Sequence, residues 1–194
     1  SEEQTKIAKE KQKEKNLDNA NIKFEIKDFK DIKGKKYSKI ISIGQFEHQN
    51  SMHYKEYFEK IYELLKDNGI AVIHYIGSNT SPKPENDFIQ RYIFPFGRCP
   101  SLSEVIPAIE KSGLILSDVD VWRKHYHYTL LEWHKNFMNK KEKITKLMGE
   151  KFTRIYRIYL WGCAQSFLND LQVIQLTLTK KIDTTPITKK YLFN

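Results

Sequence analysis

The chain has 194 residues and a mass of 23.1 kDa, which suits one α/β domain, or most of one, and excludes two independent cores. Aromatic residues make up 13% of it, too many for a disordered protein. No apolar run approaches the roughly 20 residues that span a bilayer, and the polar, lysine-rich start is not typical of a signal peptide. The two cysteines, Cys99 and Cys163, have no metal or redox spacing, which favours a reducing cytoplasm.

The net charge of +9 is concentrated in the last quarter of the chain, where residues 140–194 hold 11 basic and 4 acidic side chains. Such a surface can attract nucleic acid or an anionic membrane, but on charge alone a solvated helix face is the preferred interpretation. Charge alone does not choose between these partners. The basic residues concerned are Lys140, Lys141, Lys143, Lys146, Lys151, Arg154 and Arg157.

The first 44 residues predict one helix and two strands. Residues 1–16 are polar and consist of good helix formers, with few apolar contacts. The alternation in Ile22–Ile26 is typical of a strand, and a second, β-branched strand over 37–44 ends at Gly44.

A βαβ unit is predicted next. Apolar residues at spacings of three and four predict an amphipathic helix over 54–65, with Asp67-Asn68-Gly69 as its C-terminal stop. The nearly continuous apolar run over 70–76 predicts a strand buried on both faces of a parallel sheet. The chain is therefore expected to be α/β.

Residues 78–100 change character, being rich in proline and aromatic side chains, and we interpret them as an insertion beyond the carboxyl ends of the strands, where doubly wound sheets bind ligands. The remaining periodic segments predict three helices and two strands, followed by a tail without clear periodicity from Lys181. These are helices over 102–112, 129–138 and 152–168, and strands over 114–122 and 173–179.

From the residues alone, no catalytic constellation is evident. Glu47 follows a strand end, His74 lies inside a buried strand, and Tyr126 stands between two histidines. From the residues alone, a polar residue opening a loop and a satisfied core histidine are the preferred explanations of the first two. The histidines at 125, 127 and 134 lack an acidic or cysteine partner at ligand spacing, so we predict no metal site.

In their residue order, several short segments of the chain resemble the cyclopropane-fatty-acyl-phospholipid synthases and the mycolic acid cyclopropane synthases. They are Ile-Gly-Gln-Phe-Glu-His at 43–48, Ile-His-Tyr-Ile-Gly-Ser at 73–78, Tyr-Ile-Phe-Pro at 92–95, Pro-Ser at 100–101 and Tyr-Leu-Trp-Gly-Cys-Ala-Gln-Ser-Phe at 159–167. The resemblance runs in order from residue 1 to about 180. It implies an incomplete doubly wound sheet of an S-adenosylmethionine-dependent methyltransferase, with residues 1–180 as its C-terminal portion, a lipid-facing insertion at 78–100 and a tail at 181–194.

The resemblance also implies a reaction, the formation of a cyclopropane ring on cis-unsaturated acyl chains of phospholipids. An alkene is a poor nucleophile, so methyl transfer generates carbocation character, and a base must then remove a proton from the new methyl group. In the family this base is thought to be bicarbonate, held here by Glu47, His74, the Ile76 amide and Tyr126, with Glu47, His74 and Tyr126 as the catalytic set. Nearby aromatic residues, Tyr92, Phe94 and Trp122, either face the cation or pack in the core.

For the cofactor, the resemblance implies only part of a site, formed by Gln4, Asp28 and Phe29. The glycine-rich loop that should follow the first strand is absent from these 194 residues, as is the family's cysteine ligand, for which Cys99 is no positional substitute. We therefore expect this chain alone to be inactive, a fragment that needs a missing N-terminal half or another copy, as in a homo-oligomer.

Two alternatives stay open. One is an inactive remnant, or a partner-dependent subunit that binds lipid without transferring methyl groups. The other, a nucleic-acid-binding module, rests on the isoelectric point of about 9.3 and lacks a basic-aromatic motif, so nucleic acid is not expected as a partner. The expected location is cytoplasmic, peripheral at the inner membrane surface, with anionic headgroups contacting the basic last quarter.

Overall fold

A computed structural model describes residues 1–15 and 21–189, which belong to two units, Ser1–Lys35 and Lys36–Asn194. The first unit contains helix α1 (Glu2–Glu14), which confirms the helix predicted for 1–16 except at residue 16, outside the described residues. Ser1 begins this helix as its N-cap, its hydroxyl accepting a hydrogen bond from the Gln4 amide at 3.3 Å. A 3-10 turn, η1 (Phe29–Asp31), follows and buries no residue.

The strand predicted over Ile22–Ile26 is wrong, because residues 21–28 form no regular secondary structure. Its three apolar side chains are all exposed, Ile26 by 59%. A strand forms only when a neighbouring strand accepts and donates its backbone hydrogen bonds, and no described residue supplies one here. Alternating hydrophobicity alone does not create a sheet.

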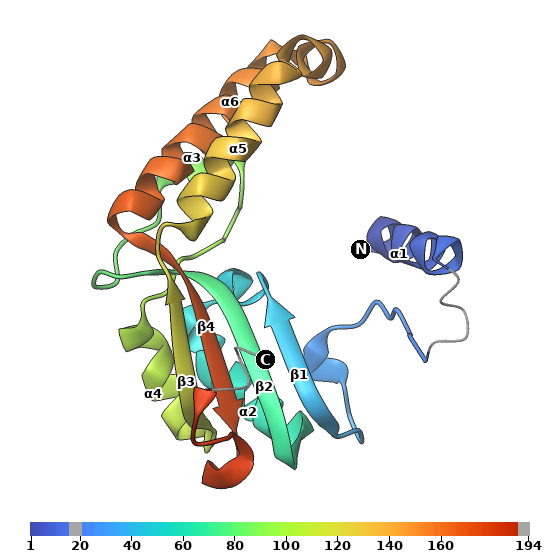
Figure 1. Ribbon diagram of the computed structural model, residues 1–194, viewed down its shortest axis with the longest axis vertical. Helices are drawn as coiled ribbons and strands as arrows, with labels where there is room; N and C mark the ends of the chain where they lie inside the picture. Colours follow the sequence, from blue (N-terminus) through green and yellow to red (C-terminus); the bar gives the residue numbers. More distant parts are fainter. Residues whose placement is uncertain (16–20, 190–194) are drawn as a thin grey trace. The chain divides into compact units, whose positions relative to one another are not determined.

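The second unit is built on a four-stranded sheet with the order β1-β2-β4-β3 (Figure 1). Strands β1 and β2 run parallel, whereas β4 runs antiparallel to both β2 and β3. The register places Ile41 beside Val72 and Ile43 beside His74. The strands are β1 (Tyr37–Ile43), β2 (Leu65–Ser78), β3 (Ile115–Trp122) and β4 (Leu171–Thr179).

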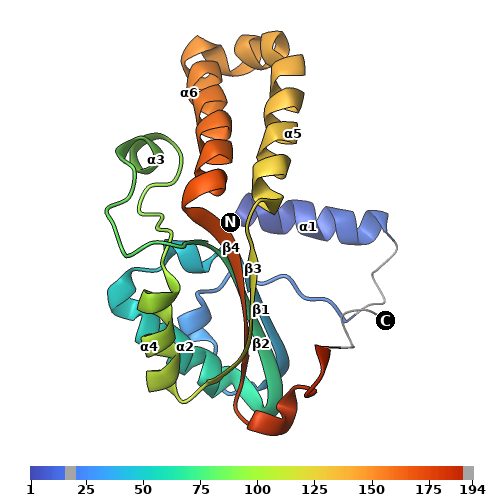
Figure 2. The same ribbon diagram turned by 60° about the vertical axis from the view of Figure 1, so that its left-hand side comes forward.

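Helices α2 (Tyr54–Leu64) and α4 (Leu102–Ser112) cover one face of this sheet (Figure 2). Along β2 the residues toward these helices, such as Ile73 and Tyr75, are fully buried, while the alternate residues are only half-buried. The expectation that this strand is buried on both faces is therefore wrong. It pairs in parallel on one side only, and the opposite face is less covered.

Local chemistry explains three features of the chain around the sheet. The Asp67-Asn68-Gly69 sequence lies inside β2 and not at the helix end, because α2 stops at Leu64 and the strand begins at once. Helix α4 begins with a capping box between Ser101 and Glu104 and ends at Gly113, whose φ of 81° favours glycine. At Gly77, a Cβ atom would lie 2.7 Å from the Pro100 carbonyl oxygen, so this position requires glycine.

The chain then forms a helical hairpin that extends beyond one end of the sheet (Figure 1), from α5 (His125–Asn139) and α6 (Lys141–Asn169). Both helices were predicted, over 129–138 and 152–168, but each begins earlier in the structure than the sequence indicates. His127 joins them, its Nδ1 donating to the Ala164 carbonyl at 2.7 Å. Helix α6 is interrupted at Gly149 (φ 85°, ψ 162°), and the short helix α3 (Asp87–Tyr92) lies within the predicted insertion.

Candidate functional site

The Phe-Glu-His sequence at 46–48 forms a 3-10 turn, η2 (Phe46–His48), shortly after the end of β1. Phe46 is completely buried and anchors this turn, with its ring centroid 4.7 Å from that of Tyr54 and 5.2 Å from that of Tyr75. The backbone of the next residue, Glu47, is held as well, because its carbonyl accepts a hydrogen bond from the Arg98 amide at 2.8 Å. Packing and backbone bonding therefore fix the position of Glu47.

The two carboxylate oxygens of Glu47 have different surroundings. Oε1 accepts a hydrogen bond from the Ile76 amide at 2.8 Å, which ties η2 to the end of β2. Oε2 is buried and has no hydrogen-bond partner within the described part of the chain. A buried carboxylate oxygen without a donor is costly, which points to a donor supplied by a ligand.

Tyr126 of α5 and Cys99 lie within the electrostatic reach of Glu47. Burial, and then the Glu47 carboxylate, raise the pKa of Tyr126, so this phenol is neutral at physiological pH and can donate a hydrogen bond. Burial, followed by Glu85 and Glu47, raises the pKa of the Cys99 thiol to about 12. The region around Glu47 thus combines one acceptor with neutral donors.

A cavity of about 760 Å³ adjoins this region, and Ile76 and Tyr126 form part of its wall. Its other walls come from α3, from the 93–100 loop and from the facing sides of α5 and α6. Most of these lining side chains are apolar or aromatic, among them Phe88, Ile89, Phe94, Leu130, Tyr159 and Phe167. The size and lining suit an extended apolar ligand.

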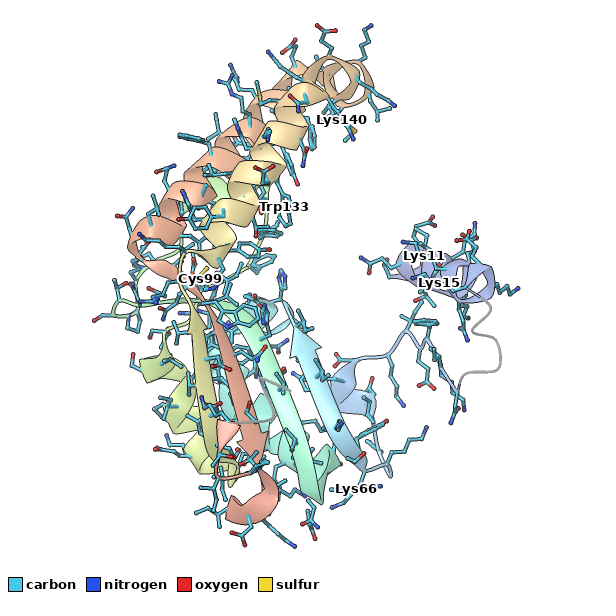
Figure 3. All side chains as sticks on the ribbon, viewed as in Figure 1. Lys11, Lys15, Lys66, Cys99, Trp133 and Lys140 are labelled. Carbon is cyan, nitrogen blue, oxygen red and sulfur yellow. The ribbon has the colours of Figure 1, made fainter. Side chains whose placement is uncertain are left out.

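Charged and polar side chains lie at one part of the cavity wall. Lys83 forms an ion pair with Asp170, and Glu85 accepts a hydrogen bond from the Cys99 amide at 2.8 Å. Figure 3 shows Cys99 where the hairpin meets the sheet. An amphiphile can therefore contact apolar walls and polar groups in one cavity.

The structure brings together Glu47, Ile76 and Tyr126 from the predicted set. His74 lies on the less covered face of β2, two residues before Ile76. The centroid of its ring is 5.6 Å from that of Trp122. The Ile76 amide, assigned to bicarbonate in the prediction, donates to Glu47 instead and so orients the carboxylate. Among the aromatic candidates, Phe94 lines the cavity, whereas Tyr92 and Trp122 do not.

The three cofactor candidates lie in the first unit, Ser1–Lys35. Gln4 is exposed in the first turn of α1, where its amide is capped by Ser1. Asp28 caps η1 by accepting a hydrogen bond from the Lys30 amide at 3.0 Å, and Phe29 beside it is half-buried. The cofactor role of these three residues stays a prediction.

Sequence reasoning missed several cavity residues. Tyr159, Cys163 and Phe167 lie in the helix predicted over 152–168, and in the structure they contact both the core and the cavity. Burial raises the pKa of Cys163 to about 11. Cys99 was set aside by its position in the sequence, although the fold places it in the cavity wall. The stripe of large side chains was the available signal, since periodicity does not distinguish a core from a pocket.

Within residues 1–15 and 21–189, no three His, Cys, Asp or Glu side chains are grouped so as to hold a metal ion. In the same part of the chain, no helix is both long and apolar enough to cross a membrane.

The sheet order and flanking helices define a class of protein, since the chain has the fold of S-adenosylmethionine-dependent methyltransferases. Cyclopropane synthase MmaA2 from Mycobacterium tuberculosis matches 85% of this chain with a TM-score of 0.75 and 24% identity, over 64% of its own chain. The mycolic acid cyclopropane synthase CmaA1, in complex with SAH and CTAB, matches 77% with a TM-score of 0.70 and 27% identity, over 57% of its chain.

The chain belongs to the mycolic acid cyclopropane synthetase family, whose model matches residues 1–176. A Pseudomonas putida protein named "Probable fatty acid methyltransferase" is 32% identical over 86% of this chain and 44% of its own length. The cyclopropane-fatty-acyl-phospholipid synthase of Escherichia coli K12 is 28% identical over 93% of this chain and 46% of its own. The chain spans about half the length of these two relatives.

Proposed function

We propose that these residues form the acyl-chain and anion-binding part of an S-adenosylmethionine-dependent methyltransferase that builds a cyclopropane ring on cis-unsaturated acyl chains of phospholipids. The observation that carries this proposal is the buried, unpartnered Oε2 atom of Glu47 beside a largely apolar cavity. A buried hydrogen-bond acceptor that has no donor suits a small anion that itself carries a hydroxyl proton, such as bicarbonate. Membership of the family supports the same assignment.

The residues of this chain would each act on a defined group. S-adenosylmethionine, when bound, supplies an electrophilic methyl group, and bicarbonate, when bound, supplies a base for the proton lost from that methyl. Glu47 Oε2 accepts the hydroxyl hydrogen of the anion, and the neutral Tyr126 hydroxyl donates to one of its oxygens. The Ile76 amide fixes Oε1, which keeps Oε2 directed toward the anion, and His74 supplies a further donor.

The cavity would hold the unsaturated acyl chain. Phe94, Tyr159 and Phe167 present aromatic surface in its wall, where the electron-rich face of a ring stabilises positive charge. The apolar lining also excludes water, which would otherwise capture a carbocation as an alcohol. The polar groups near Lys83 and Asp170 suit the headgroup end of the lipid.

The cofactor site needs more than these residues provide. Gln4, Asp28 and Phe29 would contact S-adenosylmethionine, and none of the 194 residues forms a glycine-rich loop that lets the backbone approach it. We therefore infer that the chain alone transfers no methyl group and requires that element from residues outside it. Its place of action would be the cytoplasmic surface of a membrane, where the lipid substrate lies.

A chimera tests this function directly. The matched 44% of the Pseudomonas putida relative is replaced by this chain, and transfer of labelled methyl groups to unsaturated phospholipid is measured. We expect transfer by the chimera, none by the chain alone, and at least a hundredfold loss in kcat for Glu47→Gln with KM for lipid unchanged. Equal kcat for Glu47→Gln would contradict the assignment.

A second candidate, a lipid-binding subunit without transferase activity, is favoured by the exposed edge of the sheet. Ile41 and Ile43 on β1 are 67% and 70% exposed, which suits pairing with another polypeptide. A chimera that binds phospholipid but forms no labelled product would support this candidate.

A further inference from the structure

The far end of the α5–α6 hairpin carries apolar side chains that no part of the described chain covers. The first part of α6, residues 141–148, lies across this end, and Gly149 then turns the chain back (Figure 2). Ile144 points inward and packs on the hairpin core, while Leu147 is 78% and Met148 52% exposed. The helix thus has an outward apolar pair in addition to its core-facing residue.

The same end is strongly basic. Between residues 139 and 154 the chain has six basic side chains, from lysines 140, 141, 143, 146 and 151 and Arg154, against Glu142 and Glu150. None of these five lysines forms an ion pair with a described residue, and all are exposed. Two exposed apolar side chains on a segment rich in exposed lysines match the boundary of an anionic bilayer, with acyl chains below negative headgroups.

We propose that this hairpin end, residues 140–151, is the membrane anchor of the protein, with Leu147 and Met148 inserted among the acyl chains of an anionic phospholipid bilayer and the lysines on its headgroups. The inference rests on the proposed function only in that a lipid is the substrate. Helices α5 and α6 also form two walls of the cavity, so the anchored elements are the ones that line the acyl site. Figure 3 shows Lys140 at the outer end of the hairpin and Cys99 at its base.

Charge complementarity favours a bilayer over the other possible occupants. Nucleic acid would use the lysines and leave Leu147 and Met148 in water, and a second copy of this chain would bring two basic ends together. A bilayer of mixed phosphatidylcholine and phosphatidylglycerol satisfies both features at once. Each lysine near such a surface is expected to increase partitioning about fivefold, and burial of the apolar pair about tenfold.

The test is the partitioning of the full 194-residue chain onto sedimented vesicles, with and without phosphatidylglycerol. The apolar variant carries Leu147→Ser and Met148→Ser, and the charge variant carries Gln at lysines 141, 143 and 146. The matched control is Ile182→Ser, because Ile182 is 77% exposed but lies in η4 (Ile182–Thr184), away from the hairpin. Far-UV circular dichroism and thermal unfolding establish that each variant is folded.

We expect binding at least tenfold stronger with phosphatidylglycerol, a loss of about tenfold in the apolar variant and more in the charge variant, and no change in Ile182→Ser. The proposal would be overturned if the apolar variant bound vesicles as well as the parent, or if Ile182→Ser lost binding equally. Stronger binding to an oligonucleotide than to vesicles, or self-association that needs the same residues, would also overturn it. In the chimera, methyl transfer to detergent-dispersed lipid separates the two proposals. Hairpin variants should retain it, and Glu47→Gln should lose it while still binding vesicles.

Discussion

Replacing Glu47 by glutamine should increase stability while it removes function. The amide oxygen can still accept from the Ile76 amide, now as a neutral bond about 1 kcal/mol weaker than the charged one. The buried, unpartnered Oε2 loses its charge, which should recover about 3 kcal/mol, while the amide NH₂ group that takes its place buries unpaired donors at a cost of about 1 kcal/mol. The net expectation is a gain of about 1 kcal/mol in the free energy of unfolding.

Glu85→Gln is a matched control for this effect. Glu85 also accepts a backbone hydrogen bond at 2.8 Å, from Cys99, but its second oxygen is not among the buried, unpartnered atoms of the described residues. Glu85→Gln should therefore lower the free energy of unfolding by about 1 kcal/mol, whereas Glu47→Gln should raise it by about as much. For a domain of this size, 1 kcal/mol corresponds to roughly 2–4 °C in Tm.

Urea denaturation followed by circular dichroism at neutral pH measures both variants against the parent. The expected order of the midpoints is Glu47→Gln above the parent and Glu85→Gln below it, with unchanged m-values. If Glu47→Gln instead lowers the free energy of unfolding by 1 kcal/mol or more, the carboxylate is a stabilising structural group. The argument for a ligand at Oε2 would then be refuted.

Three further results are expected. Burial raises the pKa of Cys163 to about 11 and that of Cys99 to about 12, so both thiols should react with a disulfide reagent at pH 8 roughly a hundredfold more slowly in the folded than in the urea-unfolded chain. The reaction rates of the folded chain should rise about tenfold per pH unit. Comparable rates in the folded and unfolded chains would contradict the burial of these thiols. Gly77→Ala should lower the free energy of unfolding by about 1–3 kcal/mol, because its new Cβ meets a carbonyl oxygen; an unchanged urea midpoint would show that the close approach is absent. Ile41→Lys with Ile43→Lys should reduce concentration-dependent association in sedimentation velocity, since charged side chains block pairing at a strand edge; unchanged association would place the contact elsewhere.

Much of the fold could be predicted from periodicity, because most of its elements bury one regular stripe. The helix over 54–65 follows from its apolar spacing alone, but its end at Leu64 does not, because the expected stop at Asp67-Asn68-Gly69 lies inside β2. The segment at 22–26 failed because a strand depends on a partner, which a local pattern does not contain. The relative direction of β2 and β4 is likewise a property of chain connections and not of either sequence.

The candidate site was predictable only through resemblance. Glu47 and Tyr126 are far apart in the chain, and nothing in their spacing indicates that the Glu47 carboxylate would raise the pKa of Tyr126. The role of the Ile76 amide in orienting the carboxylate depends on atomic geometry, which a sequence string does not specify. Cys99 shows the converse, since its position in the sequence argued against a place at the site and the loop returns it to the cavity wall.

The central claim is that Glu47 Oε2 receives a hydrogen bond from a small bound anion. Line broadening of ¹³C-labelled bicarbonate by the purified chain measures this without cofactor or lipid. The account predicts broadening that saturates with bicarbonate concentration in the parent and in Glu85→Gln, and its loss in Glu47→Gln. Equal broadening by the parent and Glu47→Gln would contradict it.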